Sequence, residues 1–265
     1  MTLSIETRFS FRSDQPTDVL LQFEAAIIPE QQVTEIATEL SDSSHIARVP
    51  AQDAIGERIW VIVDGEFSVV HRATVDICRI VADVQHLDQL ATHDLPGEAV
   101  EYLLDSRYCP ADRFQSFVSE EFAGLRGGPA VLAMHDWIAR HFTYTPGSSG
   151  PNTTALDSFV ERHGVCRDYA HTLVTFVRAA GIPARYVSCY APRVTPQDFH
   201  AVAEVFLADP AIPGGGAWHL LDATGMARAD EIVKIGVGRD AADVSFLTSF
   251  GATEFLDKSI SVAVV

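Results

Sequence analysis

Residues 164–171 read Gly-Val-Cys-Arg-Asp-Tyr-Ala-His and place Cys166 directly before a strongly apolar segment. Beyond Cys166, apolar residues recur at helical spacing as far as Ala180, and Gly181 and Pro183 follow where a helix would end. This pattern predicts a buried helix that begins at Cys166, because a helix that is apolar on nearly every face must be covered. A thiol at a helix N-terminus lies at the positive end of the helix dipole, which favours the nucleophilic thiolate.

The residues before Cys166 predict a second, shorter helix. Thr154 and the two polar residues before it can cap a helix over residues 155–162, which Gly164 ends. Cys166 is therefore expected in a tight turn between two helices. Asp168 falls in the first turn of the longer helix, where a carboxylate caps free N–H groups, and we interpret it as structural. Whether Arg167 or Arg185 neutralises this carboxylate stays open.

Three segments downstream alternate or are β-branched in the manner of strands and are separated by turn residues. They are residues 184–190, 200–207 and 218–222. An antiparallel arrangement of the last two would place His200 beside Asp222, since cross-strand neighbours lie roughly 5 Å apart. The buried helix would then pack on this sheet and present Cys166 to His200. Cys, His and Asp are the parts of a nucleophile, its base and the group that orients the base.

These motifs resemble the transglutaminase-like superfamily, in its branch of bacterial transglutaminase-like cysteine proteases. The similarity extends over about residues 100–225, and one departure is Val202, at a position where the family often has tryptophan. The matching motifs are GVCRDYAH at 164–171, FHAVAEVFL at 199–207, WHLLDATG at 218–225, SRYCPADR at 106–113 and FTYTPG at 142–147.

The resemblance implies an α+β chain. Residues 1–95 would form an N-terminal antiparallel β-domain, and residues 96–265 a papain/transglutaminase-like catalytic domain. In the second domain the helix carrying Cys166 would pack on an antiparallel sheet carrying His200 and Asp222.

The resemblance also implies a Cys-His-Asp catalytic triad. Cys166 would attack an amide carbonyl and form a thioester, with His200 as general base and later acid. Asp222 would accept the ring N–H of His200 and fix its tautomer. Tyr144 and Trp218 are candidates for substrate binding or for stabilising the oxyanion.

The fate of the thioester separates the functions that this resemblance implies. Attack by water on a peptide or protein substrate makes the enzyme a cysteine protease or amidase. Attack by an amine makes it a transglutaminase. Small size, an expected cytoplasmic location and no calcium-loop motif favour hydrolysis. A non-catalytic peptide-binding module that retains the fold is the remaining alternative, and an intact triad argues against it.

The composition and charge of the chain limit the classes of partner that we expect it to bind. The chain has 265 residues and a formal net charge of -17, which argues against nucleic acid and anionic membranes as partners. No apolar run is as long as a membrane span, and the first residues lack the features of a signal peptide, so a cytoplasmic location is expected. The four cysteines lie far apart without a CxxC pair, and the histidine pairs lack metal-ligand spacing. We therefore expect neither a metal nor a cofactor.

The remaining segments predict the elements around this centre. Asp64-Gly65 is a two-residue hairpin signal between strands at residues 58–63 and 66–77. The exposed strands of the N-terminal domain leave a homo-oligomer open. Further strands are predicted at residues 2–12, 18–28 and 260–265, and helices at residues 99–105, 111–125 and 129–141.

Overall fold

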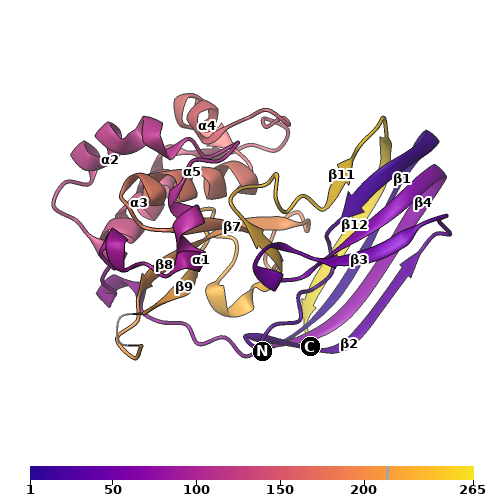
Figure 1. Ribbon diagram of the computed structural model, residues 1–265, viewed down its shortest axis with the longest axis horizontal. Coiled ribbons are helices and arrows are strands. Elements are labelled where there is room, and N and C mark those ends of the chain that lie inside the picture. The colour runs from indigo at the N-terminus through magenta and orange to yellow at the C-terminus, as the bar shows by residue number, and fades with distance from the viewer. Residues whose placement is uncertain (213–214) are drawn as a thin grey trace.

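Two antiparallel sheets organise the computed structural model, which describes residues 1–212 and 215–265. The first sheet forms one end of the molecule, and the helices gather at the other end around the second sheet (Figure 1). The mixed α+β class predicted from sequence is confirmed.

The first sheet has six strands in the order β11-β1-β4-β2, with β12 also paired to β1 and β3 to β4. Side chains of β1 and β4 alternate between buried and less buried along much of their length, which gives this sheet one apolar face. The bounds are β1 (Thr2–Leu21), β2 (Gln31–Leu40), β3 (Ile46–Pro50), β4 (Glu57–Ile77), β11 (Leu247–Ser249) and β12 (Glu254–Val264).

The hairpin predicted at Asp64-Gly65 is wrong, because β4 continues through it as one strand. Its partner β1 likewise runs from Thr2 to Leu21 without a break, whereas two separate strands are predicted from sequence at residues 2–12 and 18–28. Ser13 pairs with Gly65 and the next pair is Thr17 with Val63, so the two strands bulge instead of turning. Gly65 has a φ of 86°, which glycine adopts without strain. Burial alternates on both sides of this bulge, and a shared core therefore favours one long strand.

The end of the chain returns to the first sheet. From sequence, residues 96–265 are expected to form one catalytic domain, but β11 and β12 pair antiparallel with β1 and thus belong to the sheet of the N-terminal strands. The strand predicted at residues 260–265 is the last part of β12. Ile260 and Val262 join a buried cluster with Leu3 and Ile5 of β1. The pairing covers an edge of β1 that would otherwise expose unpaired backbone groups.

The second sheet has the order β10-β7-β8-β9 and every pair in it is antiparallel. The strands predicted around residues 184–190, 200–207 and 218–222 are present, whereas β10 was not predicted. Val233, Ile235 and Val237 do alternate with other residues in β10, but Gly236 and Gly238 disfavour strands and weaken the signal. The bounds are β7 (Ala184–Tyr190), β8 (His200–Ala208), β9 (Gly216–Leu221) and β10 (Val233–Gly238).

The helix that begins at Cys166, α5 (Cys166–Ala179), lies against the second sheet, and all of its residues from Asp168 to Arg178 are buried. Leu173 and Val177 of α5 share a core cluster with Val205 of β8. The other helices are α1 (Gly97–Val100), α2 (Gln115–Glu121), α3 (Gly127–His141) and α4 (Ala155–Glu161).

Short elements complete the chain. The region predicted as a helix at 111–125 divides into a 3-10 turn and α2, and the one at 99–105 divides into α1 and a 3-10 turn. The two turns are η4 (Glu101–Leu103) and η5 (Ala111–Phe114). Other 3-10 turns are η1 (Gln52–Ala54), η2 (Val84–His86), η3 (Thr92–Asp94) and η6 (Ala229–Glu231). A two-stranded parallel ladder joins β5 (Thr143–Tyr144) to β6 (His163–Gly164).

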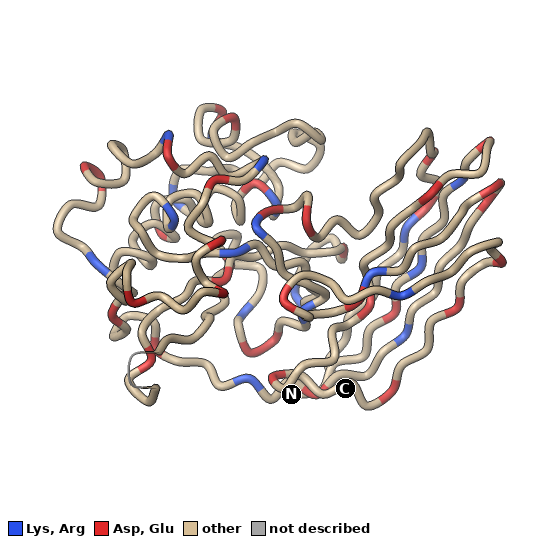
Figure 2. The backbone as a smooth tube through the Cα atoms, in the orientation of Figure 1, with Lys and Arg blue, Asp and Glu red and all other residues tan. Residues whose placement is uncertain are grey.

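Charged residues are scattered along the backbone at both ends of the molecule, with acidic and basic residues interspersed (Figure 2). Among the helices that the structure describes, none has the length and apolar character needed to cross a membrane.

A buried ionic network ties the second sheet to the N-terminal part of the chain. Arg185 of β7 contacts Glu204 of β8 at 2.7 Å and Asp53 of η1 at 2.8 Å. Lys234 of β10 pairs with both Glu204 and Glu30. Burial raises the pKa of Glu204, but Lys234 and Arg185 outweigh burial and hold that pKa at about 2. The carboxylate is therefore ionised in the core and bound by two cations.

Replacing Glu204 tests this network. We expect Glu204→Gln to lower the free energy of unfolding by about 3–5 kcal/mol near neutral pH, because two buried cations lose their anion. The difference from wild type should shrink as pH falls from 4.5 towards about 2, since the lowered pKa of Glu204 stabilises the fold only while the carboxylate is ionised. Urea denaturation measures both effects. The control is Glu39→Gln, which removes an exposed partner of Arg72; an equal loss in this control would contradict the prediction.

Candidate active site

Cys166 is the first residue of α5, and its surroundings hold the helix start rigidly. Asp168 caps the helix: one carboxylate oxygen accepts the Val165 N–H at 2.8 Å and the other accepts the Ser149 hydroxyl at 2.9 Å. A Cβ at Gly164 would lie 2.6 Å from the Cβ of Asp168, so this position requires glycine. These contacts agree with the structural interpretation of Asp168, and they fix the direction in which Cys166 leaves the turn.

Arg167 is the basic residue that lies beside the Asp168 carboxylate. The Arg167 Nε atom lies 3.9 Å from the Asp168 carboxylate, and its guanidinium also donates to the Ser149 hydroxyl and the Gly150 carbonyl. Arg185, the other candidate, is bound to Glu204 in the ionic network instead. Arg167 therefore offsets the carboxylate close to the thiol.

His200 opens β8 and its side chain is completely buried. Its Nε2 atom lies 2.9 Å from the Asp222 carboxylate, while its Nδ1 atom has no hydrogen-bond partner among the described residues. Burial lowers the pKa of His200, but the hydrogen bond to Asp222 and the interaction with Cys166 outweigh it and raise the pKa to about 10. The ring is therefore protonated at neutral pH, beside the Cys166 thiol.

Asp222 directly follows β9, in a turn that surrounds its carboxylate with donors. One oxygen accepts the Thr224 N–H at 2.9 Å and the Thr224 hydroxyl at 2.7 Å. The other accepts the Ala227 N–H at 2.8 Å as well as His200. Burial raises the pKa of Asp222, but the hydrogen bonds from His200 and Thr224 together have the larger effect in the opposite direction. The pKa of Asp222 is therefore lowered overall. The structure thus brings Cys166, His200 and Asp222 together.

Tyr144 also lies beside the thiol. Its strand β5 pairs with β6, which places Tyr144 opposite Gly164, two residues before Cys166. Burial, and after it the charge of Cys166, raise the pKa of Tyr144 to about 12, whereas the Cys166 backbone N–H acts in the opposite direction. The phenol therefore stays protonated at neutral pH and can donate a hydrogen bond near the thiol.

Trp218, in contrast, lies away from these residues. It pairs with Phe206, which is six residues along β8 from His200, a separation of about 20 Å in an extended strand. Its ring lies under the guanidinium of Arg185, 4.0 Å from the ring centroid, and packs against Tyr102. The structure thus does not bring Trp218 to the triad; it packs beside the ionic network instead.

A cavity of about 370 Å³ opens in front of Cys166 and His200. Phe199 lines it next to His200, and Phe246 and Lys258 line it from the C-terminal segment. Sequence reasoning missed Phe246 and Lys258, because nothing local indicates that β12 returns towards the triad. The cavity is therefore built jointly by α5, the second sheet and the C-terminal residues.

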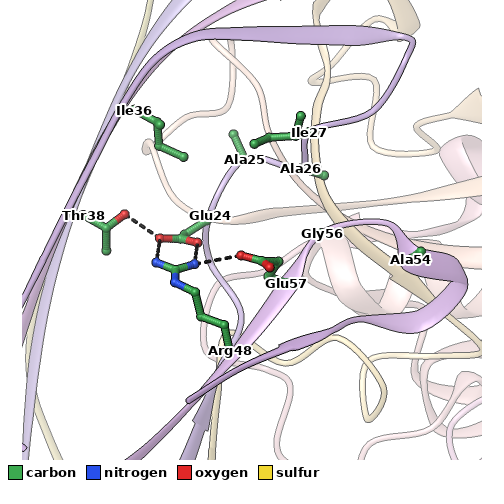
Figure 3. Close-up of a pocket in the computed structure, with 10 residues that line it drawn as sticks. All are labelled: Glu24, Ala25, Ala26, Ile27, Ile36, Thr38, Arg48, Ala54, Gly56 and Glu57. Atoms are coloured by element: carbon green, nitrogen blue, oxygen red, sulfur yellow. Dashed lines mark hydrogen bonds and ion pairs between the residues drawn. The ribbon is translucent and has the colours of Figure 1, made fainter. Parts of the chain in front are cut away.

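A second cavity of about 500 Å³ lies at the first sheet and contains none of the triad residues (Figure 3). Arg48 binds the Glu24 carboxylate with both terminal nitrogens and also contacts Glu57 at 3.0 Å. Burial raises the pKa of Glu24, but hydrogen bonds from Arg48 and Thr38 lower it overall. These groups satisfy one another, so we assign the chemistry to the cavity at Cys166. Residues 1–212 and 215–265 contain no cluster of three His, Cys, Asp or Glu side chains placed to hold a metal.

A family model and a solved structure are similar to this chain over the site. The family model described as the transglutaminase-like superfamily matches residues 119–223, a span that contains Cys166, His200 and Asp222. The crystal structure of a "putative cysteine protease" from Cytophaga hutchinsonii superposes with a TM-score of 0.90 at 30% sequence identity. That similarity covers 99% of this chain and 90% of the other, so it extends over both sheets.

Two mycobacterial proteins are similar over part of their length. An uncharacterized protein of Mycobacterium leprae is 28% identical over 167 residues, which are 58% of this chain and 57% of the relative. An uncharacterized protein of Mycobacterium tuberculosis is 32% identical over 185 residues, which are 64% of this chain and 58% of the relative. The chain thus spans less than two thirds of these relatives.

The raised pKa of His200 predicts how stability depends on pH. A raised pKa stabilises the folded state fully below the ordinary value of 6.5, and this contribution is lost as pH rises to about 10. We expect the difference in unfolding free energy between wild type and His200→Gln to be largest near pH 6 and to shrink steadily towards pH 10. Urea denaturation at several pH values measures it. A difference that stays constant over this range would contradict the assignment of a protonated His200.

Proposed function

The chain belongs to the transglutaminase-like superfamily, and from this premise we propose that it is a cysteine enzyme that cleaves an amide bond of a peptide or protein. One observation carries the proposal. The buried hydrogen bond from His200 to Asp222 leaves the other ring nitrogen of His200 free beside Cys166, at the start of a helix. This is the arrangement of a nucleophile, a base and an orienting carboxylate.

The proposed acylation step uses these three groups together. The Cys166 thiolate, paired with protonated His200, attacks the amide carbonyl and forms a C–S bond. His200 then gives its Nδ1 proton to the leaving nitrogen as the C–N bond breaks, and a thioester remains on Cys166. Asp222 accepts the Nε2 hydrogen throughout, which holds the ring in place and stabilises its positive charge.

The thioester then reacts with a second nucleophile. We propose water, activated by neutral His200, so that a carboxylic acid is released and the thiol is regenerated. The name of the Cytophaga hutchinsonii protein, which is similar over nearly the whole chain, supports a protease. The alternative is an amine in place of water, which the superfamily itself supports and which would make the enzyme a transglutaminase.

Tyr144 is proposed as the second oxyanion donor, together with the Cys166 backbone N–H. The phenol is beside Cys166, and its raised pKa keeps the hydroxyl hydrogen available. We expect Tyr144→Phe to lower kcat about 100-fold while the fold is retained, because one donor to the developing negative charge is lost. Steady-state kinetics with a peptide substrate measures the change. A variant with wild-type kcat would exclude Tyr144 from this role.

Alkylation tests the nucleophile without knowledge of the substrate. We expect iodoacetamide to label Cys166 at least about tenfold faster than Cys78 near pH 6, because the His200 imidazolium stabilises the thiolate. Cys78 is an exposed free thiol of the same chain and serves as the internal reference. In His200→Ala the rate at Cys166 should fall to that of Cys78, which should not change. Peptide mass spectrometry reads both sites, and equal labelling of the two cysteines in wild type would contradict the proposal.

The acceptor is tested with a glutamine-containing peptide and an added primary amine. Hydrolysis yields an acid, whereas amine transfer adds the mass of the amine, and Cys166→Ala should abolish either product. Rapid labelling of Cys166 without any product would leave a reactive thiol but no demonstrated acyl transfer.

A further inference from the structure

His200 is held on one side only at the end of its strand. It pairs with Cys189 of β7, but the pairing of β8 with β9 begins three residues later, at Ala203. The hydrogen bond to Asp222 fixes the ring of His200 and not its backbone. The segment that leads into His200 therefore decides how firmly the backbone of this residue is placed.

That segment, residues 191–199 between β7 and β8, is here called the docking loop, and it contacts β12. The side-chain amide of Gln197 donates to the Val262 carbonyl at 3.0 Å and accepts the Val262 N–H at 2.5 Å. Gln197 also donates to the Pro192 carbonyl at 2.9 Å. It thus occupies backbone groups at the edge of β12 as a neighbouring strand would, and it ties the two ends of the docking loop together.

The next two residues extend the contact up to His200. Both carboxylate oxygens of Asp198 lie 2.6 Å from the Lys258 ammonium of β12, and one of them also accepts the Phe199 N–H at 2.7 Å. The ring of Phe199 stacks on Phe246, with centroids 4.6 Å apart. Asp198, Phe199, Phe246 and Lys258 all line the cavity at Cys166. Three consecutive residues before His200 are thus anchored on the C-terminal part of the chain.

We propose that β12 positions His200 against Cys166 by holding the docking loop through Gln197 and Asp198. Lys258 is then a positioning residue of the proposed acyl transfer, on which this inference rests. It acts through Asp198 and does not touch the reacting atoms. A remote strand of the first sheet thereby sets the geometry of a base in the second sheet.

The experiment compares Lys258→Met and Gln197→Ala with a matched control in full-length protein. Met keeps most of the aliphatic stem of Lys258 and removes its ammonium group, with the charge and the two hydrogen bonds to Asp198. The control is Glu254→Gln, which removes the ion pair between Glu254 of β12 and Arg12. Both of these side chains are more than half exposed. An NMR titration of the His200 ring reports its contacts with Asp222 and Cys166 directly. Hydrogen exchange of the amides at residues 197–200 reports how firmly the loop is held.

We expect the titration midpoint of His200 to fall by about half a pH unit in Lys258→Met, in line with a partly exposed ion pair. Amide exchange in the docking loop should accelerate about threefold to tenfold in both variants. Cys166 alkylation should slow by a similar factor. Glu254→Gln should change none of these, and Asp198→Lys combined with Lys258→Asp should restore the midpoint.

Two results would overturn the inference: an unchanged His200 midpoint in both variants, or faster loop exchange with no change at His200. Failure of the proposed function looks different. It would appear as slow, His200-independent alkylation of Cys166 in wild type, whereas the effect of Lys258 on the His200 midpoint would still be measured.

Discussion

The hydrogen bond between His200 and Asp222 is the constraint on which the rest of the site depends. Both side chains are buried, so each charge must be compensated within the protein. Asp222 meets this need with three further donors from the turn after β9, and His200 meets it with Asp222 and Cys166. The antiparallel register of β8 and β9 brings the two residues together, and the N-terminus of α5 brings the thiol. A shift of either element would leave a buried charge without a partner.

The two sheets are coupled by charge as well as by apolar packing. The chain has two lysines, Lys234 and Lys258, and each of them links the two parts of the structure. Lys234 of the second sheet binds Glu30 of the N-terminal strands, and Lys258 of the first sheet binds Asp198 next to His200. The hydroxyl of Tyr190 on β7 adds a hydrogen bond to the Phe23 carbonyl at 2.6 Å. In a chain with a net charge of -17, these cations are placed where the two parts meet.

The local features of this structure can be predicted from the sequence, whereas most of its long-range contacts cannot. The helix at Cys166, its cap at Asp168 and the strands that carry His200 and Asp222 follow from residue types within short windows. The hairpin prediction at Asp64-Gly65 is wrong because burial of the residues on both sides of the bulge overrides the turn preference of this pair. The return of β12 to β1 and the entry of Phe246 and Lys258 into the cavity depend on partners over 200 residues apart or on tertiary packing. No local pattern encodes these contacts. Trp218 was a reasonable candidate by its closeness to Asp222 in sequence, but its strand carries it away from His200.

The residues around the cavity at Cys166 come from two parts of the chain, the segment matched by the family model and the C-terminal segment beyond it. The family match ends at residue 223, and it includes Cys166, His200 and Asp222, the proposed nucleophile, base and orienting carboxylate. Phe246 and Lys258 lie beyond that span, yet they form a wall of the cavity that faces Cys166. In the proposed reaction the first set makes and breaks the bonds, and Lys258 of the second set supports it by holding the segment before His200 through Asp198. In the proposed reaction the choice of amide depends on the second set as well, since the wall of the cavity limits what fits. Under these two proposals, relatives that share the family segment without the returning strand would differ both in how His200 is held and in the substrate that they admit.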